Sequence, residues 1–252
     1  MSTPTSLELP DGVRRTTIRT ARGAFAALEA APASGVCERD AALLVPGYTG
    51  SKEDFLAILD LLADDSRHVV AIDMRGQFET AGADEPGGYA AAALGADILA
   101  IMHATGARHL VGHSYGGLIG REAVLAAAGA EFASFTLMSS GPGALTGPRA
   151  RDLRAMLASL GAGDGGRPGA AAPDKDAPDK DAPDKDALRA GIAELWRSYL
   201  EPQAIAAGVP GHIVAFLGRR MRDNDPDGLV LMAAHMLAAP DRTAELARLD
   251  QL

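Results

Sequence analysis

The sequence contains little of several features that would point to particular classes of protein. It has one cysteine, Cys37, so no disulfide can form within the chain, and a reducing compartment such as the cytoplasm is expected. Acidic residues outnumber basic ones, 33 to 24, which disfavours nucleic acid or a membrane surface as a partner. Its hydrophobic fraction of 47% is nevertheless ordinary for a globular protein.

Long apolar runs are also missing. The longest, residues 229–239, contains His235 and is too short to cross a bilayer. Residues 1–6 have neither the basic nor the apolar region of a secretory signal. The sequence therefore predicts a cytoplasmic protein with no membrane partner.

The most informative stretch is residues 108–117, where a short apolar strand leads into a Gly-x-Ser-x-Gly turn. A helix is predicted directly after it, from Tyr115 to about Ala128. This order of strand, turn and helix is typical of a nucleophile elbow, which presents Ser114 for attack on a substrate. The alternative interpretation is an ordinary glycine-rich turn after a buried strand.

The details of this turn agree with the elbow. Small residues are needed two positions before and two positions after the serine, and Gly112 and Gly116 occupy those positions. The N–H of Tyr115 is predicted to lie at the N-terminus of the helix, where the helix dipole favours a developing oxyanion.

Strands and helices alternate around the elbow, between residues 41 and 143. Apolar runs predict buried strands at 41–45, 68–73 and 132–138. Apolar residues at helical spacing predict helices at 55–62 and 89–105. Residues 13–20 and 24–29 are expected to form an opening hairpin. The short connections predict an α/β fold with a doubly wound, mostly parallel sheet.

Ligands of such sheets bind at the carboxyl ends of the strands. Gly47 and Tyr48, Asp73 and Ser114 all lie at the C-terminal ends of predicted strands. We therefore expect these residues to converge on one edge of the sheet.

The alternation stops near residue 144, which divides the chain into a core (1–143) and a helical cap (144–252). Helices are predicted at 149–160, 188–200, 210–222, 227–239 and 242–249. Between the first two lie three copies of Pro-Asp-Lys-Asp-Ala, so residues 161–187 are expected to be a disordered loop without a catalytic role. A metal-binding acidic tract is disfavoured, because each lysine offsets one of the two aspartates.

With these segments in place, the chain resembles the α/β-hydrolase fold family, of the lidded esterase and lipase type. The resemblance lies in residues 44–50, 70–77 and 111–117, and covers about residues 7–143. It implies that Ser114 is the nucleophile and that the N–H groups of Tyr115 and Tyr48 bind the oxyanion.

The loop of Tyr48 begins Pro46-Gly47, where many relatives have His-Gly. The resemblance further implies that His113 lines the pocket beside the nucleophile, and that neither a cofactor nor a metal is needed. Asp73 and Arg75 match a frequent turn of the family, and we expect them to be structural, pairing around the pocket floor, rather than catalytic.

The resemblance also implies residues that the sequence does not contain. A serine nucleophile needs a histidine base and an acid. In this fold the order along the chain is nucleophile, acid, histidine. No apolar strand ending in aspartate and no Gly-His loop follows the cap. The chain is therefore interpreted as truncated, with six strands present and the last two missing. The alternative is that a cap histidine, His212 or His235, serves as the base.

Two functional hypotheses follow. The first is a serine hydrolase that acts on a small ester or related acyl substrate through an acyl-enzyme on Ser114, with perhydrolysis open to the same residues. A serine at the elbow argues against epoxide hydrolysis and dehalogenation, which use aspartate in this fold. The second is an inactive or fragmentary relative that binds a small apolar ligand or a partner, because the histidine and the acid of the triad are absent. In either case the strand at 132–138 would be an exposed edge that favours self-association.

Overall fold

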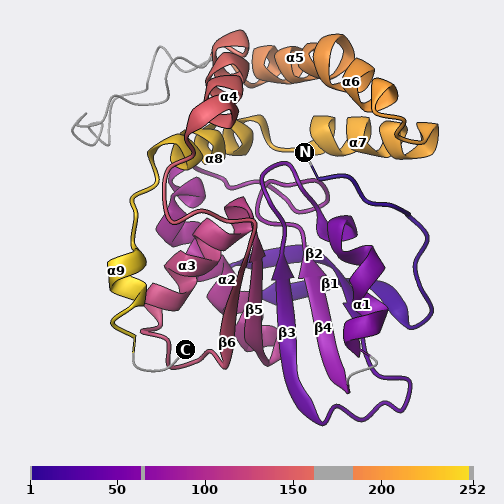
Figure 1. Cartoon of the computed structure of the whole chain (residues 1–252), viewed down its shortest axis with the longest axis vertical. Helices are drawn as coiled ribbons and strands as arrows, with labels where there is room; N and C mark the ends of the chain where they lie inside the picture. Colours follow the sequence, from indigo (N-terminus) through magenta and orange to yellow (C-terminus); the bar gives the residue numbers. More distant parts are fainter. Residues whose placement is uncertain (1, 64–65, 162–183, 250–252) are drawn as a thin grey trace.

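The computed structural model describes residues 2–63, 66–161 and 184–249, and its described strands form one six-stranded sheet (Figure 1). The strands are β1 (Val13–Thr20), β2 (Gly23–Ala30), β3 (Arg39–Val45), β4 (Arg67–Ile72), β5 (Ala107–His113) and β6 (Ser134–Met138). Their order across the sheet is β1-β2-β4-β3-β5-β6.

The direction of the strands divides the sheet in two. β1 and β2 form the predicted antiparallel hairpin, and β2 also pairs antiparallel with β4. β3 lies parallel to both β4 and β5, and β5 is parallel to β6. The doubly wound, mostly parallel sheet predicted from the sequence is therefore confirmed.

Helices cover both faces of the sheet. Alternate residues of a strand point to opposite faces, so Leu43 and Val45 pack into one hydrophobic cluster and Leu44 into another. The first cluster is closed by α2 (Ala91–Thr105) and α3 (Tyr115–Ala126), and the second by α1 (Leu56–Ala63). Strands that are buried on both faces explain why the sequence contains continuous apolar runs.

The cap lies over one end of the sheet (Figure 1). It contains α4 (Gly147–Ser159), α5 (Lys185–Leu195), α6 (Glu201–Ala206), α7 (Gly211–Asp223) and α8 (Pro226–Ala238). A π-helical turn (Trp196–Leu200) joins α5 to α6, so the helix predicted at 188–200 continues further than expected. The short α9 (Thr243–Leu246) lies beside α3 on the flank of the core, where Arg242 is paired with Glu122.

Most of the predicted disordered loop, residues 162–183, falls outside the described residues. Its last residues differ from the prediction, because α5 already begins at Lys185. The side chain of Asp184 caps this helix by accepting a hydrogen bond from the N–H of Asp186. None of the helices in the described part of the chain is both long and apolar enough to cross a membrane.

Candidate active site

The residues predicted to form the site lie at the end of the sheet that faces the cap. Residues 46–51, which we call the oxyanion loop, follow β3, Asp73 follows β4, and Ser114 follows β5. These strands are neighbours and parallel, so their carboxyl ends meet at one edge. The topology therefore brings the three predicted segments together.

Ser114 has the backbone of a nucleophile elbow. Its φ of 51° and ψ of −116° are sparsely populated by residues that have a side chain. Its N–H donates to the carbonyl of Met138 at 2.9 Å, which ties the turn to the end of β6. Ser114 is half-buried, whereas Tyr115 and Gly116 that follow it are buried. The strained turn therefore leaves the serine accessible just before the buried start of α3.

Glycine is required on both sides of the serine. A Cβ on Gly112 would lie 2.5 Å from the Cα of Gly117, and a Cβ on Gly116 would lie 2.4 Å from the carbonyl oxygen of Pro46. Both obstacles are backbone atoms, which cannot move aside as a flexible side chain can. The spacing of glycines in the sequence thus has a steric cause.

Gly47 lies directly against Ser114. A Cβ at Gly47 would be 3.1 Å from the Cβ of Ser114 and 3.2 Å from Nδ1 of His113. The absence of a side chain at Gly47 therefore lets the oxyanion loop approach the elbow. His113 is half-buried and contacts this loop beside Ser114.

The peptide group between Gly47 and Tyr48 is held at its carbonyl. The Gly47 oxygen accepts a hydrogen bond from the N–H of Gly50 at 3.0 Å and another from Nε2 of the buried Gln77 at 3.1 Å. In a planar trans peptide the C=O and N–H point in opposite directions. Fixing the carbonyl therefore also fixes the direction of the Tyr48 N–H, which is the proposed oxyanion donor.

Sequence reasoning gave Gln77 no role, although it lies in the motif that suggested the family. The same loop contains a second unusual backbone, because Thr49 has a φ of 56°. A positive φ at a β-branched residue is an outlier and marks a strained segment.

Both tyrosines of the site reach α8 with their phenol groups. The hydroxyl of Tyr48 donates to the carbonyl of Leu229 at 2.8 Å. The hydroxyl of Tyr115 lies 3.2 Å from Nδ1 of His235, and the two rings pack edge to face. Burial raises the pKa of each phenol well above its ordinary value and lowers the pKa of His235, so all three groups are neutral near pH 7.

Within the described part of the chain, no histidine or carboxylate hydrogen-bonds to the Ser114 hydroxyl. His235, considered above as a base, instead contacts the phenol of Tyr115. The histidines of the core bind other partners: His68 binds Glu29, His103 binds Glu131 and His109 binds Ser134. The described residues therefore present the Ser114 hydroxyl without an activating group bonded to it.

Asp73 and Arg75, expected to be structural, are each paired with a charged residue that the sequence did not reveal. Arg75 makes two hydrogen bonds to the carboxylate of Asp97, at 2.6 and 2.8 Å. Asp73 binds Nζ of Lys52 at 2.8 Å and its N–H at 2.8 Å. Asp73 and Arg75 therefore do not pair with each other, and each binds a residue of another element.

A cavity of about 460 Å³ is separate from this site. It lies between residues 78–82, which follow β4, and the cap residues Arg189 and 222–225. None of Gly47, Tyr48, His113, Ser114 and Tyr115 lines it. Nor do the described residues contain a group of three or more histidine, cysteine or acidic side chains that would hold a metal ion.

Comparison with known proteins agrees with this architecture. A model of the α/β-hydrolase fold family matches residues 41–160, which include the oxyanion loop and the elbow. A hydrolase from Pseudomonas aeruginosa PA01 superposes with a TM-score of 0.59 and 21% identity, over 94% of this chain and 77% of that protein. An epoxide hydrolase from an endophytic Streptomyces gives a TM-score of 0.60 and 17% identity, over 94% and 76%.

An N-acyl homoserine lactonase, solved with N-hexanoyl homoserine, gives a TM-score of 0.56 and 16% identity, over 94% of this chain and 74% of that protein. The chain spans half the length of an α/β hydrolase from Novosphingobium aromaticivorans DSM 12444. No curated protein matches the sequence.

The sheet order, the strained serine turn and the matched segment together show that the chain has the α/β-hydrolase fold.

Proposed function

We propose that this protein is a serine hydrolase that acts on a small ester or related acyl compound. The observation that carries the proposal is the backbone of Ser114, held at φ 51° and ψ −116° between glycines that tolerate no side chain. Maintaining such a conformation costs free energy, and functional sites are where proteins retain it.

The proposed reaction has two steps. Oγ of Ser114 attacks the acyl carbon and its proton passes to a base, while the N–H groups of Tyr48 and Tyr115 stabilise the oxyanion. Collapse of the tetrahedral intermediate expels the alcohol and leaves an acyl-enzyme, which water hydrolyses to the acid and free serine. The lactonase among the structural neighbours, solved with N-hexanoyl homoserine, supports acyl compounds as the substrate class.

One observation favours a second candidate, an inactive relative that binds a small apolar ligand under the cap. Within the described residues nothing that titrates is hydrogen-bonded to Ser114, and an unactivated serine is a poor nucleophile. The cap provides apolar surface for a ligand, since Met156 and Val230 from two of its helices pack against the same hydrophobic clusters as Tyr48 and are only partly buried.

Turnover of short-chain aryl esters distinguishes the two candidates. The hydrolase proposal expects acid release by the protein, and its loss by at least about a thousandfold in Ser114→Ala. Ser140→Ala, in the turn after β6, is the matched control and should retain the activity. If the wild type does not exceed Ser114→Ala on any acyl chain from two to eight carbons, the hydrolase proposal is wrong and the binding candidate stands.

A further inference from the structure

The two residues whose N–H groups are proposed to bind the oxyanion come from separate elements. Tyr48 lies in the oxyanion loop after β3, and Tyr115 is the first residue of α3. Their phenol groups nevertheless end on one cap helix, since Tyr48 donates to the carbonyl of Leu229 and Tyr115 contacts His235. Both partners belong to α8.

This helix is fixed to the core independently of the two tyrosines. The N–H of Asp225, its N-cap residue, donates to the carbonyl of Gly76 at 2.8 Å, in the turn after β4. Gly228 lies so close to the buried ring of Tyr89 that a Cβ would be 2.6 Å from it. In its middle, Met232 and Ala233 are almost wholly buried. α8 is therefore a rigid support rather than a loosely attached lid.

We call the contacts of the Tyr48 and Tyr115 hydroxyls with α8 the tethers. They are made by the two residues whose N–H groups must point at the oxyanion. Tyr48 is half-buried and packs against clusters of both the core and the cap, so its side chain spans the boundary between them. The backbone of the next residue, Thr49, is strained, and a strained segment persists only when its surroundings hold it. The hydrogen bond from the Tyr48 hydroxyl supplies such a restraint on the cap side, opposite the hydrogen bond from Gln77 on the core side.

We propose that α8 positions both halves of the oxyanion hole through the phenol groups of Tyr48 and Tyr115, which makes His235 a positioning residue. The cap thereby sets the catalytic geometry as well as covering the site. This inference rests on the proposed function, because it concerns the same N–H groups.

The experiment measures phosphonylation of Ser114 by a fluorophosphonate, with the limiting rate and the affinity for the reagent determined separately. Tyr48→Phe and Tyr115→Phe keep the rings and remove the tethers. We expect each to lower the limiting rate by about tenfold or more, since small misplacement of oxyanion donors costs that much, and to leave affinity within about twofold. Tyr199→Phe, on the exposed side of the cap, is the control and should react as the wild type.

His235 provides a second and independent arm. His235→Asn places an amide oxygen near the position of Nδ1, so it should retain most of the rate, whereas His235→Ala should react as slowly as Tyr115→Phe. If His235 only stabilised the fold, His235→Asn and His235→Ala would react at the same rate whenever their unfolding free energies are equal.

The outcomes distinguish this inference from the proposed function. Unchanged limiting rates in Tyr48→Phe and Tyr115→Phe, or an effect on affinity alone, would overturn the positioning role while leaving the serine hydrolase intact. If wild-type Ser114 does not react at all, the proposed function fails and the inference fails with it.

Discussion

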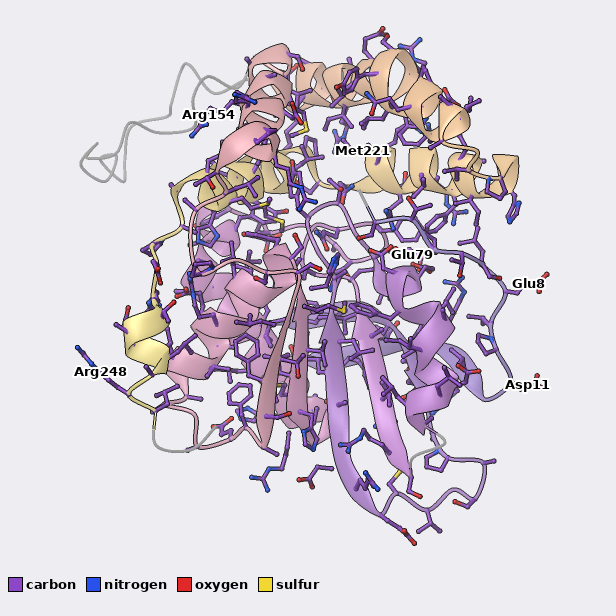
Figure 2. The ribbon with its side chains drawn as sticks, in the orientation of Figure 1. Glu8, Asp11, Glu79, Arg154, Met221 and Arg248 are labelled. Carbon is purple, nitrogen blue, oxygen red and sulfur yellow. The ribbon has the colours of Figure 1, made fainter. Side chains whose placement is uncertain are left out.

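Nζ of Lys52 lies 2.8 Å from Oδ2 of Asp73, and both side chains are almost wholly excluded from water. Glu53 and Glu79 also approach the ammonium group, at 3.3 and 2.7 Å. The pair links the start of the first helical turn to the end of β4, next to the oxyanion loop. Figure 2 shows Glu79 at this edge of the sheet, below the cap helix that carries Met221.

Removing the lysine should therefore be costly. Lys52→Met leaves the buried carboxylate of Asp73 without its cation, and we expect it to lower the free energy of unfolding by about 3 kcal/mol or more at pH 7. Lys185→Met is the matched control, because Lys185 pairs with Asp227 at the surface and should cost less than about 1 kcal/mol. Denaturant unfolding measures both, and equal effects would contradict the account.

The same pair predicts how stability depends on pH. Burial raises the pKa of Asp73 to about 6 from its ordinary value of 3.8, although the attraction of Lys52 opposes this change. Between these two values the folded chain retains a proton that the unfolded chain has lost. The contribution of Asp73 to stability should thus decrease as the pH rises from about 4 to about 6, by up to about 3 kcal/mol, and remain constant above.

The measurement is the difference in unfolding free energy between wild type and Asp73→Asn at several pH values. Asparagine does not titrate, so the difference isolates the carboxyl group. A difference that grows with pH over this interval would show that the folded-state pKa lies below the ordinary value.

Backbone strain at the elbow gives a third prediction. Glycine adopts the φ and ψ of Ser114 without a steric cost, so Ser114→Gly should be more stable than Ser114→Ala by about 1 kcal/mol. At Ser134, in the regular strand β6, the order should reverse, because glycine there gains nothing and costs chain entropy. Thermal and denaturant unfolding of the four variants decides this, and glycine being less stable at both positions would disprove the strain.

The edge of the sheet formed by β6 gives a fourth prediction. β6 pairs with β5 alone in the described sheet, and its Leu137 and Met138 are 44% and 39% exposed. We expect concentration-dependent self-association through this edge, and Leu137→Lys should reduce it. Leu61→Lys changes an equally apolar, exposed residue on α1 and should leave association unchanged. Sedimentation velocity that shows no association, or equal effects of the two variants, would contradict the prediction.

The sequence predicted what depends on local pattern. The buried strands, the hairpin and the elbow each follow from a run of neighbouring residues, and Gly112 and Gly116 revealed the turn because only glycine fits there. The contacts that hold the site could not be predicted from local sequence patterns. Tyr48 and Leu229 are far apart in the chain, and a lysine at a helix start is normally expected to be exposed, which hid the role of Lys52.

The central claim is that Ser114 is the reactive serine, and locating a phosphonate label by mass spectrometry tests it most directly. Trypsin releases residues 109–121, in which Ser114 is the single serine, whereas Ser134, Ser139 and Ser140 fall in the next peptide, residues 122–149. The account predicts that the label appears on Ser114 in the wild type and nowhere in Ser114→Ala. A label on the neighbouring peptide, or none on residues 109–121, would contradict it.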